Sequence, residues 1–155
     1  MPNQTSDNLA AFRLPCAGAN LRRAARVATQ VYDDAIRPTG MRGTQFTLLQ
    51  ALNIAPLLSQ KQLGELLGLD STTLTRTLST LRRKGWIRSQ PGADRRELRL
   101  SLTTAGKGEF QRVRPYWESA QKRLKQALGT NWNQVIDAAV RVAEAGAEVQ
   151  QKART

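Results

Sequence analysis

The sequence of 155 residues contains no histidine and a single cysteine, Cys16. Without histidine, the chain lacks the most common general base and the most common metal ligand. One thiol can form neither an internal disulfide nor a thiolate metal site. We find no glycine-rich phosphate-binding loop and no nucleophile elbow. The sequence therefore predicts no metal, no cofactor and no enzyme, although an active site built from carboxylates alone stays open.

Long apolar runs are also absent, since none approaches the roughly 20 residues of a membrane-spanning helix. The first residues, MPNQTSDN, lack the basic stretch and apolar core of a secretory signal. Hydrophobic residues make up 40% of the chain and charged residues 23%, which is typical of a globular protein. We expect one domain over residues 1–155, a cytoplasmic location and no membrane partner.

Acidic residues are few, because 12 of them stand against 24 lysines and arginines. The net charge is +12 and the isoelectric point is about 11.2. Such an imbalance indicates a polyanionic partner, either nucleic acid or an anionic membrane surface.

Residues 59–106 predict a helix, a tight turn, a second helix and a two-stranded hairpin. Ser59 and Gln62 have the spacing of a capping box at the start of the first helix, and Gly68 ends it. Asp70 can cap the second helix, which ends at Gly85. This is the helix-turn-helix pattern. The leucines expected to face inward are Leu63, Leu66 and Leu67 in the first helix and Leu74, Leu78 and Leu81 in the second.

The outer face of the second helix carries hydroxyl groups and arginines, and no acidic residue occurs between Ser71 and Lys84. Serine and threonine can bond to phosphates or base edges, and arginine can grip guanine with two hydrogen bonds. The alternative is a solvated face, but such a face usually carries Glu–Lys pairs. We therefore expect contact with DNA. The outer residues are Thr72, Arg76, Ser79, Thr80 and Arg83.

A basic hairpin follows, with a first strand over 86–90 and a break at Pro91–Gly92. In the second strand, Leu98, Leu100 and Leu102 alternate with polar residues and predict one apolar face. The connecting loop, GADRRE, places Arg95 and Arg96 at its tip, where they can reach a minor groove or a phosphate backbone. We expect Asp94 to orient one of these arginines. The alternative is a purely structural ribbon with solvated charges.

The runs LDSTTLTRTLSTLRRKGWI and DRRELRLSLTTAG resemble the MarR family of winged-helix transcription regulators. The resemblance implies a mainly α fold with a small β-wing, in which residues about 40–103 form the winged helix-turn-helix unit. Helices over about 9–37 and 104–153 would form a homodimer. It also implies release from DNA by a small ligand or an oxidant. With the analysis above, the expected DNA contacts are Ser59, Gln60, Lys61, Ser71, Thr72, Thr73, Thr75, Arg76, Ser79, Arg83, Arg95 and Arg96.

The flanking segments predict further helices over about 17–37 and 44–55, a long helix that follows Gly106 and runs to about Leu128, and a last helix capped by Thr130 or Asn131. Pro115 should kink or divide the long helix. Residues 9–14 and the last helix carry more apolar surface than one small unit can bury, so they form the expected dimer seam. Alternatively, the last helix completes a monomeric core. A two-fold dimer would bind a near-palindromic operator with half-sites roughly 34 Å apart.

Two candidate regulatory sites lie outside the helix-turn-helix. Cys16 stands at a helix start near arginines, which favours oxidation, and some MarR-family regulators sense hydroperoxides through a cysteine there. The alternative is a small buried or interfacial cysteine. By analogy with the family, an effector such as an aromatic acid would lie between the winged unit and the dimer seam. The residues expected to line that site are Asn20, Arg23, Tyr32, Arg42 and Phe46.

These observations favour a dimeric, sequence-specific transcription regulator, a repressor associated with the nucleoid. Two alternatives stay open. The basic charge also fits a sequence-independent architectural protein that binds nucleic acid, and an enzyme could carry a winged helix as a protein-contact module.

Overall fold

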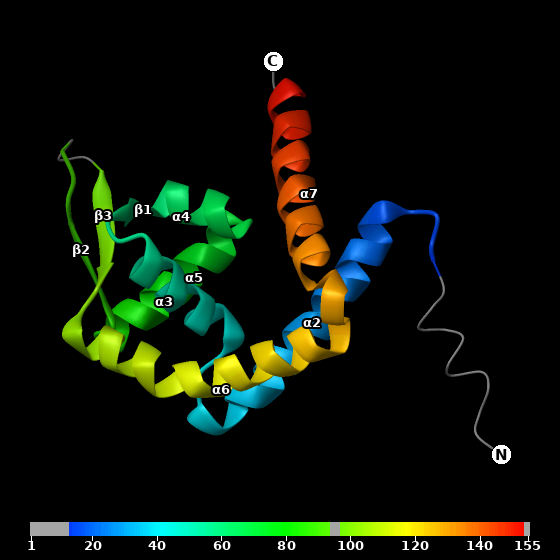
Figure 1. The fold of residues 1–155 in the computed structure, drawn as a ribbon. Helices are drawn as coiled ribbons and strands as arrows, with labels where there is room; N and C mark the ends of the chain where they lie inside the picture. Colours follow the sequence, from blue (N-terminus) through cyan, green and yellow to red (C-terminus); the bar gives the residue numbers. More distant parts are fainter. Residues whose placement is uncertain (1–12, 94–96, 154–155) are drawn as a thin grey trace.

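The computed structural model describes residues 13–93 and 97–153 (Figure 1). Helices predominate, and the three short strands form one sheet. In chain order the elements are α2 (Ala17–Ile36), the 3-10 turn η1 (Arg37–Thr39), α3 (Gly43–Ile54), β1 (Leu58–Ser59), α4 (Gln60–Leu67), α5 (Ser71–Arg83), β2 (Ile87–Pro91), β3 (Leu98–Leu102), α6 (Thr104–Leu128), the 3-10 turn η2 (Gly129–Asn131) and α7 (Trp132–Lys152).

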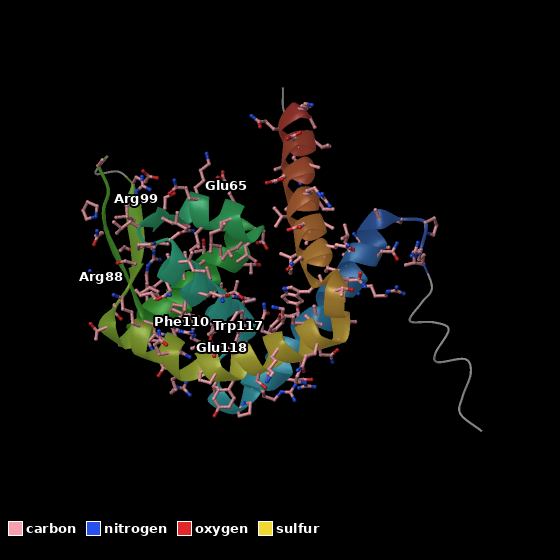
Figure 2. The ribbon with its side chains drawn as sticks, viewed as in Figure 1. Glu65, Arg88, Arg99, Phe110, Trp117 and Glu118 are labelled. Atoms are coloured by element: carbon pink, nitrogen blue, oxygen red, sulfur yellow. The ribbon has the colours of Figure 1, made fainter. Side chains whose placement is uncertain are left out.

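Most of the hydrophobic core lies within the winged helix-turn-helix unit formed by α3, α4, α5, the sheet and the first half of α6, and Ile36 at the end of α2 and Met41 after η1 complete it. Phe46 of α3 stacks on Phe110 of α6 with ring centroids 5.4 Å apart, and its ring lies 5.9 Å from that of Trp117. Figure 2 shows Phe110 and Trp117 on the side of α6 that faces the unit. The predicted inward leucines of α5, which are Leu74, Leu78 and Leu81, are buried as expected.

The sheet is antiparallel with strand order β1–β3–β2. Leu100 lies at its centre, opposite Leu58 on one side and Ser89 on the other, and is fully buried. The first strand ends at the predicted Pro91–Gly92 break, with Pro91 as the last residue of β2, paired with Leu98. A proline fits a strand end or an edge, where its missing N–H costs no ladder bond.

Two predicted apolar faces extend less far than the sequence pattern suggested. Leu98 is 52% exposed, because the hairpin projects beyond the helices that cover Leu100 and Leu102 (Figure 1). Leu66 of α4 is 60% exposed, whereas Leu63 is buried. An eight-residue helix that packs along one edge buries a single narrow stripe, and Leu66 falls outside it.

The long helix α6 runs from the foot of the β2–β3 hairpin to the foot of α7, with α2 packed beside it (Figure 1). It begins at Thr104, capped by the Thr103 hydroxyl, so Gly106 lies inside it rather than before it. Pro115 also lies inside and does not divide the helix. Phe110 and Val113 belong to the core of the winged unit. The first part of α6 is therefore part of that unit, although the sequence analysis assigned the whole helix to dimerisation.

The last helix, α7, stands away from the core. None of its residues 132–152, all of which the structure describes, is buried. Asn131 occupies the N-cap position without a side-chain cap hydrogen bond, and the turn η2 joins the two helices instead of the predicted cap. The alternative in which α7 completes a monomeric core is therefore wrong for this chain. In the described part of the chain, no helix is long and apolar enough to cross a membrane.

Candidate nucleic-acid interface

Local hydrogen bonds fix the start of α5. Gly68 adopts a left-handed conformation with φ of 60°, which ends α4 and turns the chain. Oδ1 of Asp70 then accepts a hydrogen bond of 2.9 Å from the backbone N–H of Thr73. Hydrogen bonds from Thr73 hold the pKa of the Asp70 carboxyl below its usual range, so it stays ionised beside the positive end of the helix dipole. The capping predicted at this turn is confirmed.

The opposite face of α5 is open to solvent. Its leucines anchor one side in the core, and this leaves the polar side chains on the other side uncovered by any described element. The face contains two guanidinium groups and several hydroxyls, and no acidic residue occurs along α5. One shallow hollow runs along this side of the helix, lined by the half-buried Thr80 and by the exposed residues Ser71, Thr72, Thr75, Arg76, Ser79 and Arg83.

A side-chain bond joins the first helix of the motif to the second. Nε2 of Gln60 on α4 donates a hydrogen bond of 2.9 Å to Oγ1 of Thr75 on α5. The amide oxygen of Gln60 and the second lone pair of Thr75 stay available to a ligand at the surface. Lys61, beside them, is exposed and lies 4.0 Å from Glu65.

Ser59 is a correction to the predicted contacts. It is only 4% exposed, and its hydroxyl accepts a hydrogen bond of 3.2 Å from the N–H of Gln62. The Gln62 side chain in turn accepts from the N–H of Ser59 at 2.9 Å. The N–H and the hydroxyl of Ser59 are therefore both used in the capping box that the sequence predicted. The buried Ser59 side chain is not available for a contact with DNA. Thr73 is half-buried, since it lies closer to the core than Thr72.

The wing is tied to the helices by arginines that the sequence analysis had not singled out. Nη1 of Arg99 on β3 donates to Oε1 of Gln62 at 2.8 Å, and Nη2 pairs with Glu97 at 2.7 Å. Arg82 at the end of α5 donates to Ser89 at 3.2 Å, and Arg88 donates to Ser101 at 3.2 Å. Figure 2 shows Arg88 and Arg99 along the hairpin. The predicted tip residues Asp94, Arg95 and Arg96 lie outside the described residues.

The base of the wing is held by a close backbone approach. Gly85 has φ of 70°, and its carbonyl accepts a hydrogen bond of 2.6 Å from the Thr103 hydroxyl. The N–H of Thr103 donates to the carbonyl of Trp86 at 3.0 Å. A Cβ at Gly106 would overlap the carbonyl of Trp86. The start of α6 can therefore lie this close to the Trp86 backbone only because residue 106 is glycine. The end of α5, the wing and α6 are joined at this point.

A cleft of about 250 Å³ lies between α2, α3, α6 and the turn after α4. Of the predicted ligand residues, Tyr32 and Phe46 line it. Burial raises the pKa of Tyr32, which stays a neutral phenol and donates to Gln121. Trp117, which the sequence analysis missed, completes the aromatic wall, and its ring centroid lies 6.4 Å from that of Tyr32.

The other three predicted ligand residues lie elsewhere. The side chain of Asn20 accepts a hydrogen bond from the N–H of Leu14 and donates to the carbonyls of Leu14 and Cys16, so it holds the chain that enters α2. It precedes Tyr32 by twelve helical residues, or about 18 Å. Arg23 is exposed near the same end, and Arg42 lines a neighbouring hollow. The cleft therefore contains two of the five predicted residues, and the hollow lined by Arg42 shares Asp33, Gly43 and Thr44 with it.

Cys16 occupies the N-cap of α2 and is exposed. The alternative of a cysteine buried within this chain is therefore wrong. Its oxidation, and its burial in an interface, stay predictions.

Comparisons with known proteins agree with this geometry. The sequence profile of the MarR family matches residues 39–97. The M. tuberculosis transcriptional regulator MosR, solved in complex with DNA, is 34% identical, with 86% of this chain covering 98% of that one at a TM-score of 0.75. SarZ of Staphylococcus epidermidis, a transcriptional regulator of the helix-turn-helix type, is 39% identical over 77 residues, which are 49% of this chain and 52% of SarZ.

The apo structure of MarR from E. coli shares the fold at 20% identity, with a TM-score of 0.68 over 83% of this chain and 97% of that chain. These relatives are regulators and not enzymes, which removes the enzyme alternative. A winged helix-turn-helix with an exposed acid-free helix, together with the match to MosR across its length, shows that this chain belongs to the MarR family of DNA-binding transcription regulators.

Proposed function

We propose that this chain is a sequence-specific repressor that binds a near-palindromic operator as a homodimer. The observation that carries the proposal is the outer face of α5, which is exposed, free of acidic groups and held from behind by three buried leucines. Such a helix fits the major groove, where arginine and hydroxyl side chains distinguish base pairs.

In the proposed complex, α5 supplies the base contacts. Thr72 and Arg76 stand one turn apart on the exposed face, with Thr75 beside Arg76, and the three side chains meet base edges. Ser79 and Arg83 continue this face toward the phosphate backbone, and Gln60 and Lys61 on α4 flank it. Arg95 and Arg96 at the wing tip extend the contact to the adjacent minor groove.

The dimer uses the apolar face of α7. Val135, Ile136 and Val140 are 44–51% exposed although they recur at helical spacing. Across from this helix, the end of α4 presents Leu66 and Leu67, and a groove of about 910 Å³ separates them from Val142 and its neighbours. A second copy that fills this groove and covers α7 would bury both surfaces and place two α5 helices about one DNA turn apart.

Relief of repression follows from the position of the aromatic cleft. The cleft is bounded by α2 on the dimer side and by Leu67 and Leu69 on the helix-turn-helix side. A ligand that favours one spacing of these two walls shifts the dimer from a form that binds DNA to one that does not.

We also propose that the chain acts where the DNA is, in the cytoplasm and at the nucleoid.

The test is a selection of genomic fragments by the purified full chain, followed by competition against random duplex DNA. We expect enriched fragments to share two inverted half-sites and to outcompete random DNA by at least about a thousandfold. Equal competition by random DNA would instead favour the architectural alternative, and a single unrepeated half-site would contradict the dimer.

A further inference from the structure

The aromatic cleft carries a single charged group among its lining residues. Tyr32, Phe46 and Trp117 supply three rings, Leu67 and Leu69 form the wall nearest the helix-turn-helix, and Asp33 of α2 is the charged member. No lysine or arginine lines this cleft, although the chain contains 24 of them and only 12 acidic residues. The charge of the cleft is thus opposite to the charge of the protein.

One oxygen of Asp33 is used by the fold and the other is not committed. Oδ1 accepts a hydrogen bond of 3.1 Å from the N–H of Gly43, the first residue of α3. In the described residues no arginine or lysine forms an ion pair with Asp33. Three arginines share neighbouring hollows with Asp33: Arg37 and Arg42 line one of them, and Arg26 and Arg37 line another. Of these, Arg37 pairs with Asp34.

We propose that this cleft binds a small aromatic or hydrophobic monocation, such as a protonated amine or a quaternary ammonium group. The free oxygen of Asp33 supplies the counter-charge, and the faces of Tyr32 and Trp117 attract a cation through their ring quadrupoles. This rests on the proposed relief of repression by a ligand and names its chemical class. An aromatic acid would instead place its carboxylate beside Asp33, which is unfavourable.

The same carboxylate connects the cleft to the rest of the molecule. Asp33 accepts a hydrogen bond from the first N–H of α3, and a Cβ at residue 43 would collide with its carboxylate. The Asp33 side chain therefore packs directly against the start of α3. On the opposite wall, Leu69 immediately precedes Asp70, the cap of α5. A cation between these walls therefore acts on the start of both helices.

Three probes of matched size and different charge test the proposal: phenethylamine, 2-phenylethanol and phenylacetate. Binding to the full chain is followed by the amide shift of Gly43 and by the indole N–H shift of Trp117. We expect phenethylamine to bind at least about tenfold more tightly than 2-phenylethanol, and phenylacetate to bind most weakly. Equal binding of the three probes, tightest binding of phenylacetate, or no saturable binding of phenethylamine at millimolar concentration would overturn the proposal.

A second experiment removes the negative charge of Asp33 and keeps an oxygen that can accept the hydrogen bond from Gly43. Asp33→Asn keeps an oxygen for the N–H of Gly43, so the fold is retained, and it should abolish the preference for phenethylamine over 2-phenylethanol. Asp34→Asn is the matched control, because it removes the same charge one residue later, outside the cleft, and should keep that preference. Retention of the preference in Asp33→Asn would overturn the proposal. Operator binding by the ligand-free chain is measured separately, so its failure would count against the proposed function alone.

Discussion

The guanidinium of Arg99 on β3 donates a hydrogen bond of 2.8 Å to Oε1 of Gln62 on α4. The same oxygen accepts the N–H of Ser59 at 2.9 Å, so one carbonyl joins the wing, β1 and the first helix of the motif. The Arg99 side chain is 28% exposed and also pairs with Glu97. This side chain therefore adds a contact between the wing and α4 to the backbone pairing of β1 with β3.

Replacing Arg99 by methionine should destabilise the fold, because methionine keeps the apolar stem and removes the contacts with Gln62, the Leu57 carbonyl and Glu97. We expect a loss of about 1–2 kcal/mol in the free energy of unfolding, measured by urea denaturation. Arg114→Met is the control, since Arg114 makes an exposed ion pair with Glu118 within one helix and should cost about 0.5 kcal/mol or less. Equal losses in the two variants would show that the bond from Arg99 to Gln62 contributes little.

Gly106 and Gly108 offer a matched pair on the first turns of α6. A Cβ at Gly106 would overlap the Trp86 carbonyl, whereas a Cβ at Gly108 would meet no atom within 4 Å. We expect Gly106→Ala to destabilise the chain by about 1–3 kcal/mol, because backbone atoms cannot move aside easily. Gly108→Ala should stabilise it by up to about 1 kcal/mol through helix propensity. Thermal or urea unfolding measures both, and a stable Gly106→Ala variant would contradict the described contact.

Asp70 predicts a pH dependence of stability. Its pKa is lowered in the folded chain by hydrogen bonds from Thr73, so the unfolded state binds its proton more readily. The stabilisation from Asp70 is therefore complete above the unfolded pKa of about 4 and is lost as the pH falls through the lower folded value. The urea midpoint of Asp70→Ala should lie below that of the wild type at pH 7, and this difference should narrow toward pH 2.

Asp70→Ser serves as the control for that experiment, because serine keeps a capping oxygen that does not titrate. Its midpoint should fall less than that of the alanine variant at pH 7. A difference between wild type and Asp70→Ala that does not change with pH would show that the carboxylate charge does not matter.

The proposed dimer seam is tested by a charge on the apolar face of α7. Val140 is 51% exposed, and a carboxylate there would be buried without a partner in the dimer. Val140→Asp should shift the chain to monomer in sedimentation and weaken operator binding. Gln134→Asp adds the same charge to the polar stripe of α7 and should stay dimeric. A dimeric Val140→Asp variant, or a monomeric wild type, would contradict the seam.

The helix-turn-helix could be predicted closely from the sequence because its signals are local. Ser59 and Gln62, Gly68, and Asp70 determine caps and turns over three or four residues, and the structure confirms each. Leu66 and Leu98 were assigned wrongly to buried faces because periodicity gives the direction of a side chain and not the extent of the surface that covers it. The exposure of Leu98 depends on how far the hairpin projects.

The two functional sites also differ in how far local sequence signals could predict them. The exposed face of α5 follows from helical spacing alone, so it could be predicted. The cleft depends on contacts between residues far apart in the chain, such as Tyr32 and Trp117, and no local pattern brings them together. The sequence does not indicate that Asp33 belongs to the cleft, because its position follows from the hydrogen bond with Gly43, ten residues later. Arg99 could have been suspected from Glu97 two positions earlier, but its bond to Gln62 could not.

The measurement that tests the central claim most directly is a titration of the selected operator with the wild-type chain, Arg76→Ala and Arg82→Ala. Arg76 lies on the exposed face of α5, whereas Arg82 turns toward the wing and bonds Ser89. Arg76→Ala should weaken binding by about 1–3 kcal/mol, roughly fivefold to 150-fold, and relax the preference at one base position. Arg82→Ala should leave base preference unchanged. Full affinity and unchanged selectivity in Arg76→Ala would contradict the assignment of α5 as the helix that recognises DNA.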